Sequence, residues 1–223
     1  MNNPSTDPQE GRIILVDKPL HWTSFDVVKK LRYHFKFKKI GHAGTLDPLA
    51  TGLLVLCTGK KTKEIEKYQG QEKEYTGTFL IGQTTPSYDL ETEPTPPVDI
   101  THISKADLED AAKYFTGTIT QTPPIFSAVK VKGKRAYEHA RKGEDVKLKS
   151  REVTIKIFKI TAFNKPEVSF RVVCSKGTYI RSLAHDFGQK LGVGAYLASL
   201  RRTRIGNFNV ADAATIETLT AKE

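Results

Sequence analysis

Hydrophobic and polar residues alternate along this chain with spacings that predict both strands and helices. Two short apolar runs, Arg12 to Val16 and Leu53 to Cys57, are typical of buried strands. The segment Glu72 to Ile81 is rich in β-branched and aromatic residues and predicts a third strand. Between the first two strands, Thr23 or Ser24 is expected to cap a helix, which follows a loop holding Lys18 and Pro19. Apolar positions recur in it at helical spacing: Val27, Val28, Leu31 and Phe35.

The second half of the chain contains the same mixture of patterns. The segment Ser104 to Phe115 predicts a capped helix. Apolar residues alternate with polar ones in Val153 to Ile157 and in Val168 to Cys174, and we expect these two strands to pair antiparallel. A helix with an apolar stripe follows at Ile180, Leu183, Ala184, Phe187 and Leu191. Because strands and helices do not alternate regularly, the pattern favours an α+β fold over a doubly wound one.

Two segments lack a core-forming pattern. Thr84 to Thr101 is rich in Pro, Thr and acidic residues, which predicts an irregular surface loop. Thr122 to Lys149 is mostly polar and basic, with a short helical patch at Ala136 to Arg141. We expect this second segment to protrude and to close on a ligand.

Composition describes a soluble globular chain, because 38% of its 223 residues are hydrophobic and 27% are charged. We expect one large domain.

The longest apolar run, Leu53 to Cys57, is too short to cross a bilayer. The N-terminal residues also lack the features of a signal peptide, so we expect a cytoplasmic protein without membrane contact. Cys57 and Cys174 lie in apolar strands, and their spacing predicts neither a disulfide framework nor a zinc site.

The net charge of +10 favours a polyanionic partner, because Lys and Arg side chains that neutralise phosphates release counterions. Charge alone does not identify that partner. Three segments concentrate the cationic side chains, in an arrangement that could follow a folded RNA. They are Lys29 to Lys39, Lys130 to Arg151, and Arg201 to Arg204.

One carboxylate lies in a loop of the kind that holds a reactive side chain. The stretch Gly41 to Lys63 reads GHAGTLDPLATGLLVLCTGKKTK and places Asp47 just before an apolar strand. Gly41 and Gly44 permit close backbone approach and unusual dihedral angles, and Pro48 disfavours the helical conformation at Asp47. Taken alone, such an Asp more often stabilises its own turn than reacts with a substrate.

This loop resembles the G-H-x-G-x-L-D-P-x-x-x-G motif of the TruB family of pseudouridine synthases. Further stretches resemble that family in the same order: EYTGTFLIGQTTPSYD from Glu74, TPPIFSAVKVKGKRAYEHAR from Thr122, SKGTYIRSLAHDFG from Ser175 and LRRTRIGNF from Leu200. The resemblance covers about Gly11 to Asn209. It implies that the chain converts uridine 55 of the tRNA TΨC stem-loop to pseudouridine, with neither a cofactor nor a metal.

The resemblance implies three catalytic residues. Asp47 matches the catalytic Asp, which attacks the uridine or stabilises the charge that develops on it. Arg181 matches the arginine that pairs with this carboxylate. Tyr75 matches the tyrosine that stacks on the target base and that accepts or relays the proton. Without the resemblance, Arg181 would be interpreted as a solvated helix residue and Tyr75 as a packing residue.

The resemblance also implies RNA-binding residues. The target base must leave its stacked arm to reach the carboxylate, and His42 matches the histidine that occupies the vacated space. Tyr179 and Leu200 match pocket positions, for which ordinary packing is the alternative interpretation. Lys18 and Lys130 match positions near the RNA or the active site, and we interpret both as phosphate contacts.

The implied architecture is the α+β pseudouridine synthase fold. It has a mixed, mostly antiparallel central sheet flanked by helices, and a protruding thumb-like element at 122–149 that contacts RNA. We expect residues 1–223 to form a single catalytic domain with a flexible N-terminus at 1–10, and to act as a monomer without a protein partner. Many family members continue into a small C-terminal RNA-binding domain of the PUA type, which we expect to be missing here, with Lys29 to Lys39 as a replacement for its contacts.

Two other functions compete with this interpretation. A catalytically silent tRNA-binding protein or RNA chaperone would need the basic segments and His42, but it would not need Asp47. The joint presence of Asp47, Tyr75 and Arg181 disfavours that alternative.

Nucleotide hydrolysis is suggested by Gly59 and Lys60, which follow a strand. A phosphate-binding loop would also need Gly at position 54 and Ser or Thr at position 61. The chain has Leu54 and Lys61 there, which excludes this motif.

Overall fold

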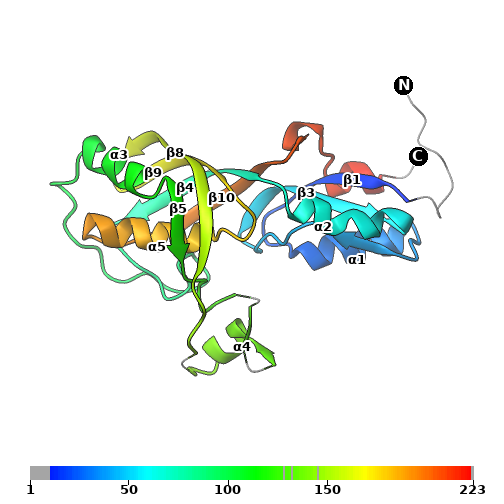
Figure 1. Cartoon of the computed structure of the whole chain (residues 1–223), viewed down its shortest axis with the longest axis horizontal. Helices are drawn as coiled ribbons and strands as arrows, with labels where there is room; N and C mark the ends of the chain where they lie inside the picture. Colours follow the sequence, from blue (N-terminus) through cyan, green and yellow to red (C-terminus); the bar gives the residue numbers. More distant parts are fainter. Residues whose placement is uncertain (1–10, 128, 132, 145, 222–223) are drawn as a thin grey trace. The chain divides into compact units, whose positions relative to one another are not determined.

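A computed structural model describes residues 11–127, 129–131, 133–144 and 146–221 of the protein (Figure 1). The N-terminus at 1–10, expected to be flexible, lies outside the described residues. The chain falls into two units, unit 1 from Met1–Tyr75 and Leu200–Glu223, and unit 2 from Thr76–Ser199. Two strands, β4 (Lys73–Ile81) and β10 (Ala195–Ile205), each have one end in unit 1 and the other in unit 2. The expectation of a single domain stays a prediction.

Unit 1 is built around the long strand β3. Its elements are β1 (Ile13–Lys18), α1 (Ser24–His34), β2 (Ile40–His42), β3 (Ala50–Thr58), the 3₁₀ helix η1 (Gly59–Glu64), α2 (Ile65–Gln69), the start of β4, the end of β10, β11 (Phe208–Asn209), the 3₁₀ helix η2 (Val210–Asp212) and α6 (Ile216–Thr220). Strands β1 and β2 pair with β3 antiparallel, whereas the end of β10 pairs with it parallel. The expected helix and strands are confirmed, although Lys18 ends β1 and does not lie in the loop after it.

The core of unit 1 lies on both faces of β3. Leu54 and Leu56 pack with residues of α1 and α6 on one face. Leu53 and Val55 pack on the other face, where Tyr68 of α2 joins them. A strand that is covered on both sides reads as a continuous apolar run, which explains why this segment shows no alternation of polar and apolar residues.

Unit 2 contains a sheet and two helices packed on each other. Its elements are the rest of β4, α3 (Lys105–Tyr114), β5 (Gly117–Gln121), β6 (Lys130–Val131), β7 (Lys134–Arg135), α4 (Ala136–Ala140), β8 (Arg151–Asn164), β9 (Glu167–Cys174), α5 (Ile180–Leu191) and the start of β10. The strand order is β10-β4-β9-β8-β5, and the predicted antiparallel pairing of β8 with β9 is confirmed. Helix α3 packs on β8 and on α5.

Aromatic rings from the sheet and from α5 fill the core of unit 2. The Phe79 ring of β4 lies 4.1 Å from that of Phe170 in β9, measured between centroids. Phe187 of α5 lies 5.5 Å from Phe79 and from Phe158 of β8. Both predicted helices are confirmed, and α3 carries a capping box in which Ser104 and Asp107 exchange hydrogen bonds. The α+β fold expected from the sequence is therefore confirmed.

The segment 122–149 projects from the sheet of unit 2, as expected (Figure 1). Its described residues form the small hairpin of β6 and β7 followed by α4. His139 of α4 is buried, and its Nδ1 lies 2.5 Å from a carboxylate oxygen of Glu144. This contact links α4 to the residues that follow it. Closure of the segment on a ligand stays a prediction.

The segment 84–101 is irregular, but the prediction that it lies entirely on the surface was wrong. Thr85, Ser87 and Asp89 are buried. The hydroxyls of Thr85 and Ser87 both donate to the Asp89 carbonyl, at 2.7 and 3.0 Å. Short polar side chains thus replace regular secondary structure in satisfying the buried backbone here.

In the described parts of the chain, every helix is too short or too polar to cross a membrane.

Candidate active site

Asp47 lies in the loop between β2 and β3, and neighbouring segments of unit 1 fasten that loop on both sides of the carboxylate. The Ser24 hydroxyl accepts a hydrogen bond from the Leu46 N–H at 2.8 Å and donates to the Leu46 carbonyl at 3.1 Å. On the other side, the His21 N–H donates to the Pro48 carbonyl at 2.8 Å. The loop therefore holds Asp47 in a defined position, which is what a catalytic side chain requires.

Arg202 of β10 supports the same loop from within the core. It is only 1% exposed, and its guanidinium donates to the carbonyls of Leu53 at 2.8 Å, Gly44 at 3.0 Å and Thr45 at 3.3 Å. Gly44 has a φ of +106°, a conformation that favours glycine. The rigid fork of an arginine suits three carbonyls that point in different directions.

This role of Arg202 was not predicted from the sequence. Arg202 was expected to belong, with Arg201 and Arg204, to a basic segment that could follow a folded RNA, and for the buried Arg202 that prediction was wrong. Arg201 forms a two-fold hydrogen-bonded pair with Asp17, at 3.0 and 2.7 Å, and Arg204 lies 2.9 Å from a carboxylate oxygen of Glu72. Arg202 stands between two polar residues, Arg201 and Thr203, so the sequence carried no signal that it is buried.

Lys18 is fully buried at the end of β1, at 0% exposure. Its ammonium donates to the carbonyls of Pro19 at 2.9 Å and Trp22 at 2.6 Å. Burial lowers the pKa of Lys18 to about 8, the charge of Asp47 acts in the opposite direction, and the charge of Arg202 lowers it further. The side chain thus holds the loop before α1 and interacts with Asp47. Because the ammonium is fully buried, the predicted contact of Lys18 with a phosphate was wrong.

His42 ends β2, opposite Leu56 of β3, and is half-buried. Burial lowers its pKa, the nearby charge of Arg202 lowers it further, and a hydrogen bond with the backbone of Gly44 partly offsets both effects. Its Nδ1 is buried and has no hydrogen-bond partner among the described residues. A neutral, flat ring beside the Asp47 loop is compatible with filling the space of a displaced base, and this role stays a prediction.

Tyr75 and Leu200 also belong to unit 1. Tyr75 lies in β4 and is 8% exposed. Leu200 pairs in parallel register with Ala50, the first residue of β3, and therefore lies close to the end of the Asp47 loop. Their contacts with a target base stay predictions.

Arg181 lies at the start of α5 in unit 2 and is 4% exposed, so it is not a solvated helix residue. Its guanidinium donates to the Phe126 carbonyl at 2.9 Å and lies 3.5 Å from a carboxylate oxygen of Asp89. Asp89 was not among the residues singled out from the sequence, although it closes the stretch that begins at Glu74. The proposed pairing of Arg181 with Asp47 joins residues of different units and stays a prediction.

Two further expected RNA-binding residues lie in unit 2. Tyr179 precedes α5, where its backbone exchanges two hydrogen bonds with the Gln121 side chain. The Arg151 guanidinium lies over the Tyr179 ring at 4.9 Å from its centroid. Lys130 is exposed in β6 of the projecting segment, as a phosphate contact would have to be. Within the described residues, no three His, Cys, Asp or Glu side chains are arranged to hold a metal ion.

Sequence comparison finds two family profiles that together span residues 32–223. Residues 32–180 match "TruB family pseudouridylate synthase (N terminal domain)". Residues 181–223 match "tRNA pseudouridylate synthase B C-terminal domain". The border between the two profiles falls inside unit 2, so it does not coincide with the division of the structure into units.

Curated relatives match along nearly the whole chain. A tRNA pseudouridine synthase B of Flavobacterium johnsoniae is 57% identical over 211 residues, which are 92% of this chain and 92% of the relative. A protein of the same name from Phocaeicola vulgatus is 52% identical and covers 94% of this chain and 92% of its own length.

Solved structures show the same fold. A chain of a Cbf5-Nop10-Gar1 complex is 31% identical with a TM-score of 0.75, over 96% of this chain and 54% of the other. A chain of an H/ACA RNP bound to a substrate RNA containing 2'-deoxyuridine is 27% identical with a TM-score of 0.71, over 95% and 53%. This protein spans about half the length of those two chains.

Proposed function

This chain belongs to the TruB family of pseudouridylate synthases, and we propose that it isomerises uridine 55 in the TΨC loop of tRNA, with Asp47 as the catalytic carboxylate. The observation that carries the proposal is the fixed loop of Asp47, which Ser24, His21 and Arg202 hold from three sides. The relatives named tRNA pseudouridine synthase B support tRNA as the substrate.

The proposed reaction requires a carboxylate that is fixed in position, and it does not require a cofactor. The bond from N1 of the base to C1′ of the ribose breaks, a bond from C5 to C1′ forms, and the proton lost from C5 is balanced by a proton gained at N1. An ionised Asp47 can attack the uridine or stabilise the charge that develops during this exchange. The buried Lys18 ammonium supports this role because its charge interacts favourably with the carboxylate.

The remaining site residues take supporting roles in the proposal. Tyr75 stacks on the target base, and Arg181 directs Asp47 through an ion pair. His42 occupies the space that the base leaves, and Lys130 of the projecting segment contacts the RNA backbone. Tyr179 and Leu200 complete the wall of the pocket.

The direct test is to incubate the protein with an unmodified tRNA transcript and to map pseudouridine at single-nucleotide resolution. We expect one modified position, uridine 55, and no product from a transcript that carries cytidine there. Product at another position alone would refute the assigned position, and no product at all would refute the reaction.

The variant Asp47→Asn separates the enzyme from a catalytically silent tRNA-binding protein. It keeps the shape of the side chain and removes its charge, so we expect product formation to be lost while tRNA binding survives. Asp110→Asn, which changes an exposed carboxylate of α3, is the matched control and should keep full activity. Full activity of Asp47→Asn would overturn the assignment of Asp47.

We further expect the protein to act as a monomer, without a protein partner, in the cytoplasm where tRNA is used. Light scattering on the purified protein, alone and with tRNA, tests the oligomeric state. A stable dimer would contradict the first expectation.

A further inference from the structure

The outward face of α1 combines aromatic and cationic side chains. Phe25, Lys29 and Tyr33 follow one another at four-residue spacing, and Lys30 and His34 form the neighbouring row. Phe25 and Tyr33 are 69% and 72% exposed. The opposite face of the helix is buried in the core of unit 1, so the fold itself gives no reason for aromatic rings on the outward face.

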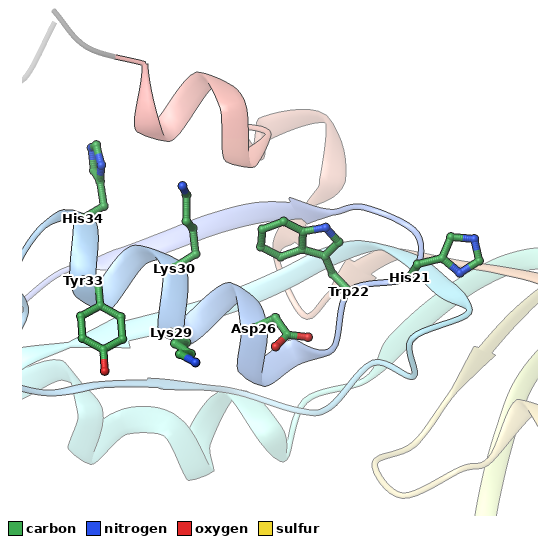
Figure 2. A pocket seen from close by; sticks show the side chains of 7 residues that line it. All are labelled: His21, Trp22, Asp26, Lys29, Lys30, Tyr33 and His34. Atoms are coloured by element: carbon green, nitrogen blue, oxygen red, sulfur yellow. The ribbon is translucent and has the colours of Figure 1, made fainter.

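This face borders a hollow of about 700 Å³. Figure 2 shows Trp22, Lys30 and His34 on one side of the helix and Lys29 and Tyr33 on the other. A volume of this size lies in the range of sites that bind small organic groups, about 300–1,000 Å³, and a nucleotide falls within that class. The hollow is open to solvent along the helix.

One end of the hollow is joined directly to the loop of the proposed catalytic carboxylate. His21 lines the hollow, and its N–H donates to the carbonyl of Pro48, the residue after Asp47. Ser24, at the start of α1, bonds Leu46 on the other side of the carboxylate. The start of α1 is therefore attached to the Asp47 loop on both sides of the carboxylate.

The charge of the segment fits a polyanion. Residues 21–40 contain six Lys and Arg side chains and a single acidic one, Asp26. Among the described residues, Lys29 and Lys30 have no carboxylate within ion-pair distance, so their ammonium groups are available to a ligand. Helix α3 provides a contrast, because it exposes Tyr114 beside three acidic residues and two lysines.

We propose that the outward face of α1, from Trp22 to His34, binds an unpaired stretch of the RNA substrate next to the target nucleotide. Tyr33 stacks on a base, and Lys29 and Lys30 contact phosphates. Aromatic platforms alternating with cations are the usual design of surfaces for single-stranded nucleic acid. The inference rests on the proposed function for the identity of the ligand as RNA, but it is tested by binding and does not depend on catalysis.

The test measures the dissociation constant of unmodified tRNA by fluorescence anisotropy at several salt concentrations. Tyr33→Ala should weaken binding about fivefold or more, because stacking on an aromatic side chain contributes that much per base, and Tyr33→Phe should restore it. The double variant Lys29→Gln/Lys30→Gln should lower the slope of log affinity against log salt by about 1.4, because each phosphate contact to a single strand contributes about 0.7. Lys29→Arg/Lys30→Arg should keep the slope.

Variants of α3 serve as matched controls. Tyr114→Ala removes a ring of similar exposure, and Lys105→Gln/Lys113→Gln removes two exposed charges. Both should bind tRNA like the unchanged protein. Because all these side chains are exposed, we expect unchanged melting temperatures throughout.

Kinetics separate this inference from the proposed function. In the α1 variants the loss should appear in KM more than in kcat, because Asp47 and its loop are intact. If the unchanged protein makes no pseudouridine, the proposed function fails while the binding result still decides the role of α1. If Tyr33→Ala and Lys29→Gln/Lys30→Gln bind tRNA with the affinity and salt slope of the α3 controls, the inference is overturned.

Discussion

Ser24 and Leu46 exchange two hydrogen bonds that tie the start of α1 to the loop of Asp47. The Leu46 N–H donates to Ser24 Oγ at 2.8 Å, and Ser24 Oγ donates to the Leu46 carbonyl at 3.1 Å. Ser24 is buried, and the neighbouring Thr23 performs the capping of the helix. The Ser24 hydroxyl therefore stabilises the loop of Asp47 and not the helix end.

We expect Ser24→Ala to reduce both stability and activity. The buried Leu46 N–H loses its partner, which costs about 1–3 kcal/mol of the free energy of unfolding. Because the loop is less well fixed, Asp47 leaves its reactive position for part of the time, and kcat should fall roughly 10- to 100-fold. Urea unfolding and single-turnover kinetics on tRNA measure the two effects.

The adjacent Thr23→Ala is the control for this variant. It removes the capping box with Asp26 and should cost about 1 kcal/mol of stability, while it leaves the bonds between Ser24 and Leu46 intact. Its kcat should stay close to that of the unchanged protein. An equal loss of kcat in both variants would show that the activity follows general stability and not the position of the loop.

Arg202→Lys tests the second support of the loop. A lysine cannot donate to the carbonyls of Leu53, Gly44 and Thr45 together, so we expect a loss of about 2–3 kcal/mol in the free energy of unfolding, together with lower kcat. Arg201→Lys is the matched control, because the pair of Arg201 with Asp17 is partly exposed and such pairs contribute about 0–1 kcal/mol. Equal stability of the two variants in urea unfolding would contradict the role assigned to Arg202.

The sequence predicted those parts of the fold whose information is local. Helix α1 could be placed because Thr23 stands before a run with helical spacing, and β8 and β9 because their apolar residues alternate. Asp47 could be singled out because Gly41 and Gly44 permit unusual dihedral angles, because Pro48 disfavours the helical conformation, and because the loop resembles a family motif. In each case, neighbours along the chain determine the outcome.

The parts that could not be predicted depend on contacts between distant segments. Arg202 is followed and preceded by other polar residues, and it is buried only because β10 lies beside β3. Gly52 also depends on the contact between β3 and β10, since a Cβ at that position would lie 2.3 Å from the Arg202 carbonyl oxygen. Lys18 is buried where β1 pairs with β3, so its neighbours along the chain do not show that it is buried. The pairing register that buries these residues leaves no local trace in the sequence.

Lys18 should make stability depend on pH in the alkaline range. Burial lowers its pKa in the folded state to about 8, whereas the unfolded value is about 10.4. Between these values the unfolded state binds more protons, so the free energy of unfolding gains a contribution that rises with pH. We therefore expect the stability of the unchanged protein relative to Lys18→Met to increase from pH 8 to pH 10.

Urea unfolding of both proteins at each pH measures this difference. Other titrating groups are common to the two proteins and cancel in the comparison. A difference that stays constant from pH 8 to pH 10, or that falls, would show that the Lys18 ammonium is not desolvated in the folded state.

Asp186 of α5 should act in the opposite direction at acid pH. Burial raises its pKa to about 6, above the unfolded value of about 3.9, so the folded state binds more protons in between and stability is lost as the pH rises from about 4 to 6. Asp186→Asn removes the charge, so we expect the free energy of unfolding to vary less with pH in this range. At pH 7 we expect the variant to be more stable by about 1–2 kcal/mol. This is less than the full pKa shift implies, because the side chain is partly solvated. Urea unfolding at pH 4.5 and pH 7 measures the effect, and Asp110→Asn on exposed α3 should leave both values unchanged. If Asp186→Asn is no more stable than the unchanged protein at pH 7, the carboxylate is stabilised by its surroundings and its burial carries no cost.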